Sequence, residues 1–89
     1  MEKSNSADQL FEAVLTLKSK EECYKFFSDA CTPKEIQAIA QRFTVGKMLY
    51  EKAVYSEIIE ATGASTATIS RVGRSINEGY KMVFERLKK

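Results

Sequence analysis

The 89-residue sequence contains no histidine and no tryptophan. Because histidine is the commonest general base and the commonest ligand of transition metals, its absence argues against hydrolytic and zinc chemistry. The two cysteines, Cys23 and Cys31, lack C-x-x-C spacing and so predict neither a metal knuckle nor a disulfide scaffold. We therefore expect no enzyme, no catalytic residue and no metal ligand, and two reduced thiols.

Glycine and proline are also scarce, with four residues and one residue, and a long apolar run is missing. Few turn-forming residues argue against a β-sandwich, while 44% hydrophobic and 29% charged residues are typical of a chain that folds. The polar segment 1–6 lacks the apolar stretch of a signal peptide, which predicts a cytoplasmic protein that enters no membrane. The length predicts one domain, 1–89, with a thin core that favours a dimer.

Apolar residues recur at steps of three and four along the chain, which predicts an all-α fold without strands. The strongest start signal is Thr32-Pro33-Lys34-Glu35, where threonine caps, proline takes the first helical position and glutamate completes a capping box. Asn5 or Ser6 is expected to cap the first helix, and Ser19 and Glu22 to form a capping box before the second. The expected helices cover residues 6–17, 20–30, 33–51, 56–62, 66–76 and 80–88.

The segment 56–76 has the pattern of a helix-turn-helix. Gly63 is expected to end its first helix in the left-handed conformation, and Ser65 to cap its second helix. The second helix begins with small polar residues, which can approach base edges in the major groove without a steric conflict. The pattern therefore favours a DNA-reading helix over an ordinary buried corner.

Positive charge gathers in the same part of the chain. Residues 63–89 contain six basic and two acidic residues, a net charge of +4, although the whole chain carries only +2. No acidic residue lies between Glu60 and Glu78, so phosphates would meet no fixed negative charge there. We predict a sequence-specific transcriptional regulator that binds double-stranded DNA. The alternative is a helical dimerisation or adaptor module whose basic helix binds an acidic protein partner.

Three strings carry a resemblance to a known family: Thr32-Pro33-x-Glu35, Gln41-Arg42 and Gly63-Ala64-Ser65-Thr66-Ala67-Thr68-Ile69-Ser70-Arg71. Over roughly residues 8–88 the chain resembles the Trp repressor superfamily, and more closely its YerC/YecD-type branch. The resemblance implies a six-helix Trp-repressor-like fold, an intertwined homodimer, and repression at a palindromic operator with half-sites about 34 Å apart. The DNA-binding residues that we expect are Ser65, Thr66, Ala67, Thr68, Ser70, Arg71, Arg74 and Ser56, the last standing where the better-known repressor has a basic residue.

The resemblance also implies a candidate pocket for an amino-acid co-repressor. Its residues are Thr32, Arg42, Arg71 and Ser75, which match the positions that hold tryptophan in the tryptophan-responsive members. An arginine plane can stack on an aromatic ring and pair with a carboxylate. However, Val72 stands where those members have glycine, and its branched side chain argues against tryptophan. In the alternative interpretation no cofactor binds. Arg71 then contacts phosphate, Arg42 packs in the dimer, Thr32 caps a helix and Ser75 lies on the surface.

Overall fold

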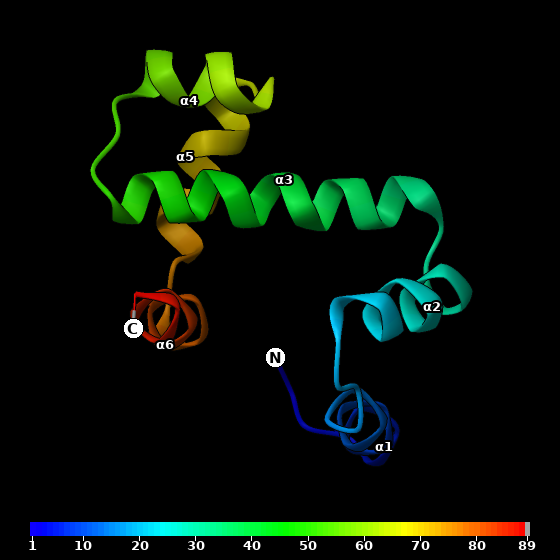
Figure 1. Cartoon of the computed structure of the whole chain (residues 1–89). Helices are drawn as coiled ribbons and strands as arrows, with labels where there is room; N and C mark the ends of the chain where they lie inside the picture. The colour runs from blue at the N-terminus through cyan, green and yellow to red at the C-terminus, as the bar shows by residue number, and fades with distance from the viewer. Residues whose placement is uncertain (89) are drawn as a thin grey trace. The chain divides into compact units, whose positions relative to one another are not determined.

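A computed structural model describes residues 1–88, which form six helices and, over that range, no strand. The helices are α1 (Asn5–Val14), α2 (Lys20–Ala30), α3 (Pro33–Tyr50), α4 (Tyr55–Thr62), α5 (Thr66–Ser75) and α6 (Glu78–Leu87), in the expected order (Figure 1). The chain divides into two compact units, Met1–Pro33 and Lys34–Lys89, and each is described by itself. Within the described part of the chain, no helix has the length and apolar character needed to cross a bilayer.

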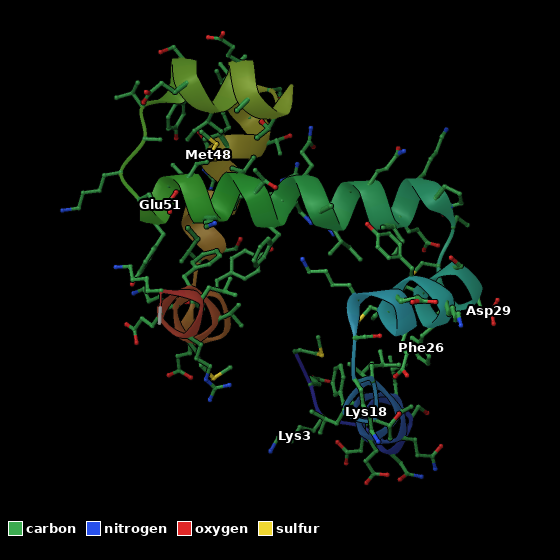
Figure 2. All side chains as sticks on the ribbon, in the orientation of Figure 1. Lys3, Lys18, Phe26, Asp29, Met48 and Glu51 are labelled. Atoms are coloured by element: carbon green, nitrogen blue, oxygen red, sulfur yellow. The ribbon has the colours of Figure 1, made fainter. Side chains whose placement is uncertain are left out.

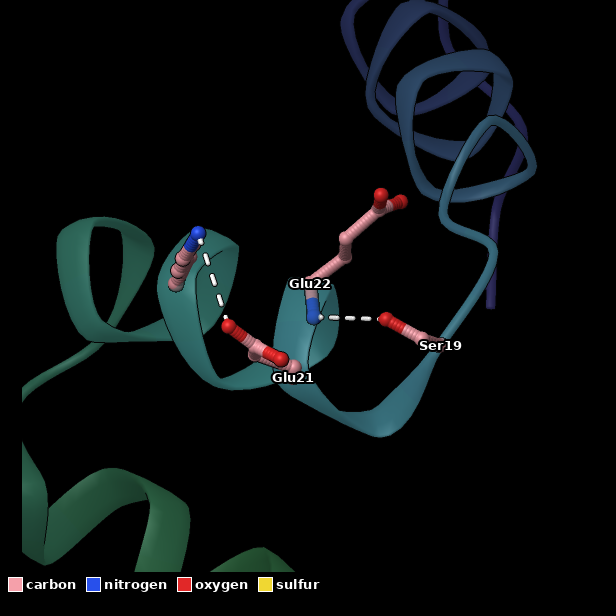
Figure 3. A network of polar contacts seen from close by, with 4 residues as sticks. Ser19, Glu21 and Glu22 are labelled. Carbon is pink, nitrogen blue, oxygen red and sulfur yellow. Dashed lines mark hydrogen bonds and ion pairs between the residues drawn. The ribbon is translucent and has the colours of Figure 1, made fainter.

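Serine side chains cap both helices of the Met1–Pro33 unit. The Ser4 hydroxyl accepts a hydrogen bond from the Ala7 N–H at 3.1 Å, so α1 is capped before the expected Asn5 or Ser6. The Ser19 hydroxyl accepts from the Glu22 N–H at 3.1 Å, as expected (Figure 3). The Glu22 carboxylate, however, accepts from the Lys18 N–H at 2.9 Å, one residue earlier than a capping box requires.

Helix α1 ends at Val14, three residues before the expected end. The chain tightens there into a turn, because the Thr16 N–H and hydroxyl both donate to the Ala13 carbonyl, at 3.0 and 2.6 Å. The Leu17 N–H donates to the Val14 carbonyl at 3.1 Å. Such bonds to the third preceding residue keep apolar side chains on a helical spacing beyond the α-helix itself, which explains the longer prediction.

The Met1–Pro33 unit has no buried side chain, although α1 and α2 are amphipathic. Phe26 and Phe27 are half-buried and meet edge to face with their ring centroids 5.1 Å apart; Figure 2 shows Phe26 on α2. On α1 and the turn after it, Leu10, Phe11 and Leu15 are exposed, Leu15 by 84%. Apolar surface of this kind gains free energy only when another surface covers it.

The Lys34–Lys89 unit has its own core, built where α3, α4 and α5 meet. Figure 1 shows α4 on one side of α3 and α6 on the other, with α5 crossing α3 between them. Met48 lies on the α4 side of α3 and packs against this core (Figure 2). The fully or almost fully buried residues of the core are Val45, Ile58, Ala64, Ile69 and Val72.

An aromatic cluster fixes α6 against α3. The Phe84 ring is buried, with its centroid 5.3 Å from those of Phe43 and Tyr50 and 5.4 Å from that of Tyr80. Gly46 lets Tyr80 approach, because a Cβ at this position would lie 2.9 Å from the ring. This packing outweighs the low helix propensity of Gly79, so α6 begins at Glu78 and not at the expected residue 80.

The turn between α3 and α4 places Lys52 at φ 66°, in the left-handed region. A residue with a Cβ costs roughly 1–2 kcal/mol there, whereas glycine adopts the conformation freely but loses more entropy on folding. We expect Lys52→Gly to raise the free energy of unfolding by about 0.5–1 kcal/mol in urea titrations. The neighbouring Glu51→Gly is the control, since φ is not positive at Glu51 and glycine there should stabilise nothing. Equal effects of the two changes would contradict the prediction.

Candidate nucleic-acid interface

The turn between α4 and α5 has the geometry of a helix-turn-helix. Gly63 has φ 71° and its N–H donates to the Ile59 carbonyl at 2.8 Å, which ends α4 in the predicted left-handed conformation. Ala64 follows and is only 3% exposed, packed into the core beneath the turn. The small side chain at this position allows the two helices to approach closely.

Thr62 ties the end of α4 to the rest of the unit. Its hydroxyl donates to the Ile58 carbonyl at 2.7 Å and accepts from the Ala64 N–H at 3.1 Å. Its carbonyl accepts from the side-chain amide of Gln41, on α3, at 3.1 Å. Gln41 was part of the motif that the sequence singled out, and this bond gives it a structural role in fixing the turn.

Ser65 caps α5 and also orients Thr68. The Ser65 hydroxyl accepts from the Thr68 N–H at 3.2 Å, as predicted for the cap residue, and donates to the Thr68 hydroxyl at 3.1 Å. The oxygen of Thr68 therefore accepts a hydrogen bond, which leaves its own hydrogen available to an outside acceptor. Thr66 and Ala67, in the same first turn, are exposed.

Helix α5 has a buried face and an exposed one. Ile69 and Val72 are 0% and 2% exposed and belong to the core. Ala67, Arg71 and Arg74 follow one another at steps of four and three residues, so they share the exposed face. The expected DNA-binding residues of α5 are thus brought together on one accessible helix, with the two arginines in its second and third turns.

The electrostatics of this surface suit a polyanion. No residue in the first turn of α5 is acidic, and its last turn holds Arg74. The N-terminus of a helix carries a partial positive charge, which favours phosphate nearby. An exposed arginine offers five donors in a planar fork that matches a phosphate, so the surface can bind a DNA backbone.

Two residues of α4 lie at the edge of this surface. Ser56 is exposed in the first turn of α4, as a DNA-contacting residue must be. Its neighbour Tyr55 places its hydroxyl 3.3 Å from that of Ser70 on α5. Sequence reasoning missed Tyr55, because nothing in a linear pattern pairs residues fifteen positions apart before the helix-turn-helix geometry is known.

The candidate effector residues are only partly brought together. A hollow of about 280 Å³ in the Lys34–Lys89 unit includes Arg42 and Ser75 in its lining, together with Val72. The Ser75 hydroxyl donates to the Val72 carbonyl at 3.1 Å, so its hydrogen is used within α5. Arg71 is exposed on α5, and Thr32 belongs to the Met1–Pro33 unit. A shared effector role for these four residues stays a prediction.

A helix-turn-helix formed by the fourth and fifth of six helices is typical of DNA-binding transcription regulators. The family model described as Trp repressor protein matches residues 5–88. The chain belongs to the Trp repressor family, whose members regulate transcription and are not enzymes.

Individual relatives agree with the family assignment. The chain is 55% identical over 84 residues to the uncharacterized protein YerC of Bacillus subtilis, covering 91% of this chain and 81% of the relative. It resembles the crystal structure of a TrpR-like protein from Eubacterium eligens with a TM-score of 0.93 and 55% identity, covering 97% and 92% of the two chains. It also resembles the crystal structure of a protein from Staphylococcus aureus described as a putative Trp repressor, with a TM-score of 0.91 and 47% identity, covering 97% of this chain and 89% of the other. The predicted all-α, Trp-repressor-like, YerC-type fold is confirmed.

Proposed function

We propose that this DNA-binding regulator is a sequence-specific repressor that recognises double-stranded DNA in the cytoplasm through α5. The exposed face of α5 carries the proposal, because it combines hydroxyl groups for base edges with arginines for phosphates. The core beneath it, which includes Ile69 and Val72, holds the helix rigidly. The proposed contacts are Ser65, Thr66, Ala67, Thr68, Ser70, Arg71, Arg74 and, from α4, Ser56.

We propose further that the working form is an intertwined homodimer. The exposed apolar side chains of α1 and the turn after it support this proposal, as does Ile39 on α3, which is 48% exposed. A second copy of the chain would cover this surface and supply the core that Met1–Pro33 lacks. Two copies of α5 related by a twofold axis would then read a palindrome with half-sites about 34 Å apart. Occupancy of such a site in a promoter would block polymerase sterically, which is why we propose repression.

The experiment that tests this function is selection of bound duplexes from a random library by the purified full-length protein. We expect enrichment of one palindrome, since each half of the dimer reads the same bases. A template carrying that palindrome in its promoter should be transcribed less when the protein is added. Random enrichment would contradict the proposal. In a separate pull-down, capture of an acidic protein that survives nuclease treatment would favour the adaptor alternative.

The same selection tests the effector hypothesis when it is repeated with each amino acid in turn. An amino acid that binds between Arg42 and Ser75 should change the enrichment of the palindrome. We expect tryptophan to change nothing, because Val72 occupies part of the lining of that hollow. Enrichment that ignores every amino acid would reject the pocket and leave the DNA-binding proposal intact.

A further inference from the structure

A hydroxyl pair links the two helices of the helix-turn-helix at the edge of the proposed DNA-binding surface. The Tyr55 hydroxyl, at the first position of α4, lies 3.3 Å from the hydroxyl of Ser70 in the middle of α5. Tyr55 is 42% exposed and Ser70 is half-buried, so the pair stands where the protein surface meets solvent. A ligand that covers α5 would therefore meet both residues.

Chemistry assigns the donor of this pair. The geometry allows either hydroxyl to donate. Because a phenol O–H is a stronger hydrogen-bond donor than the O–H of an aliphatic alcohol, the arrangement in which Tyr55 donates and the Ser70 oxygen accepts is favoured. The hydrogen of Ser70 is then directed away from Tyr55. In this arrangement Ser70 receives a hydrogen bond from α4 and keeps its own hydrogen for another acceptor.

The hydroxyls of Thr44 and Ser75, in helices of the same unit, behave differently. Thr44 donates to the Ala40 carbonyl at 3.0 Å, and Ser75 donates to the Val72 carbonyl at 3.1 Å. Such bonds to the preceding turn use the hydroxyl hydrogen within the helix. The side chain of Ser70, by contrast, makes a hydrogen bond with Tyr55. Ser70 is therefore set apart from these hydroxyls by its contact with a residue of another helix.

We propose that Tyr55 is a positioning residue that makes Ser70 a hydrogen-bond donor toward a base edge in the major groove. A donor pairs with the acceptors of that groove, which are N7 and O6 of guanine, N7 of adenine and O4 of thymine. It discriminates against the amino groups of cytosine and adenine, which need an acceptor. Tyr55 thereby sets the base preference at the position that Ser70 reads, and this inference rests on the proposed DNA-binding function.

The test compares the wild-type protein with Tyr55→Phe and Ser70→Ala in the same duplex selection. Phenylalanine keeps the ring and removes only the hydroxyl, so the fold should be retained, as thermal unfolding will show. We expect Tyr55→Phe to lower the preference at one base pair of each half-site by about 3- to 10-fold, the worth of one neutral hydrogen bond. Ser70→Ala should weaken the same position, and the double variant should do no more than Ser70→Ala alone. Tyr24→Phe, on the exposed side of α2, is the matched control and should change no position.

The other possible results of this comparison contradict the inference in different ways. Unchanged base preferences in Tyr55→Phe, with a loss in Ser70→Ala, would overturn the role of Tyr55 while leaving the DNA-binding function in place. A uniform loss of affinity over all sequences, without a change in preference, would make Tyr55 a phosphate contact and would also overturn the inference. If the wild-type protein itself enriches no sequence, the proposed function fails, and the inference fails with it.

Discussion

Phe84→Ala is expected to lower the free energy of unfolding by about 3–5 kcal/mol, the usual cost of removing a buried aromatic side chain. Phe84 is 2% exposed, and its ring contacts Phe43 and Tyr50 of α3 and Tyr80 of α6. Alanine would leave a cavity that these three rings cannot fill without leaving their present positions. Urea unfolding monitored by circular dichroism measures this loss of free energy.

The control for this variant is Lys81→Ala on the same helix, whose side chain is exposed. Its effect should stay within about 0.5 kcal/mol, as is usual for surface substitutions. Both variants must be compared at one protein concentration, because the stability of the proposed dimer would depend on concentration. A loss below 1 kcal/mol in Phe84→Ala would show that the aromatic cluster is not a main source of stability.

The double variant Arg71→Ala and Arg74→Ala is expected to weaken binding to the selected duplex by about 100-fold or more near 100 mM salt. Both side chains are exposed on α5, and in a homodimer the two changes remove four positive charges. The slope of log affinity against log salt is negative, and each phosphate that loses its cation reduces its magnitude by about 0.9. The magnitude of the slope should therefore decrease by roughly 3–4. Binding measured by fluorescence anisotropy at several salt concentrations gives both quantities.

The matched control removes the same number of charges elsewhere. Lys3 and Lys18 are exposed in the Met1–Pro33 unit, so Lys3→Ala with Lys18→Ala changes the net charge equally (Figure 2). This control should leave the salt slope almost unchanged, because the proposed phosphate contacts are Arg71 and Arg74 of α5 and not these two lysines. Equal losses in the two double variants would mean that only total charge matters, and that α5 does not contact the phosphates.

Most of the fold could be predicted from the sequence, because each helix has an apolar period and most have a local start signal. The ends of the helices were less predictable where tertiary contacts or turns decide them. Gly79 suggested a break, yet α6 runs through it because Tyr80 and Phe84 pack against α3. Helix α4 begins at Tyr55, one residue early. Its cap residue Val54 has no side-chain acceptor, but the Glu57 carboxylate accepts from the Val54 N–H at 3.0 Å and ties the cap residue to the first turn.

The candidate site was predictable in its exposed residues and not in its contacts. The small polar residues and arginines of α5 are visible in the sequence, and the structure places them together on an accessible helix. The Ser65 to Thr68 pair lies within one helical turn, so it too could have been inferred from the cap. The Tyr55 to Ser70 pair could not, because it depends on the angle between two helices that the turn at Gly63 sets.

The uneven distribution of buried side chains has a consequence for the order of events during synthesis. Residues 1–33 leave the ribosome before residues 34–88, yet they contain no buried side chain, whereas the later residues carry the core. Domains usually fold in the order in which they emerge, at about 5–20 residues per second. Here the first third of the chain has nothing of its own to fold around. In the proposed homodimer its apolar side chains would stay exposed to the cell until a second molecule has been made.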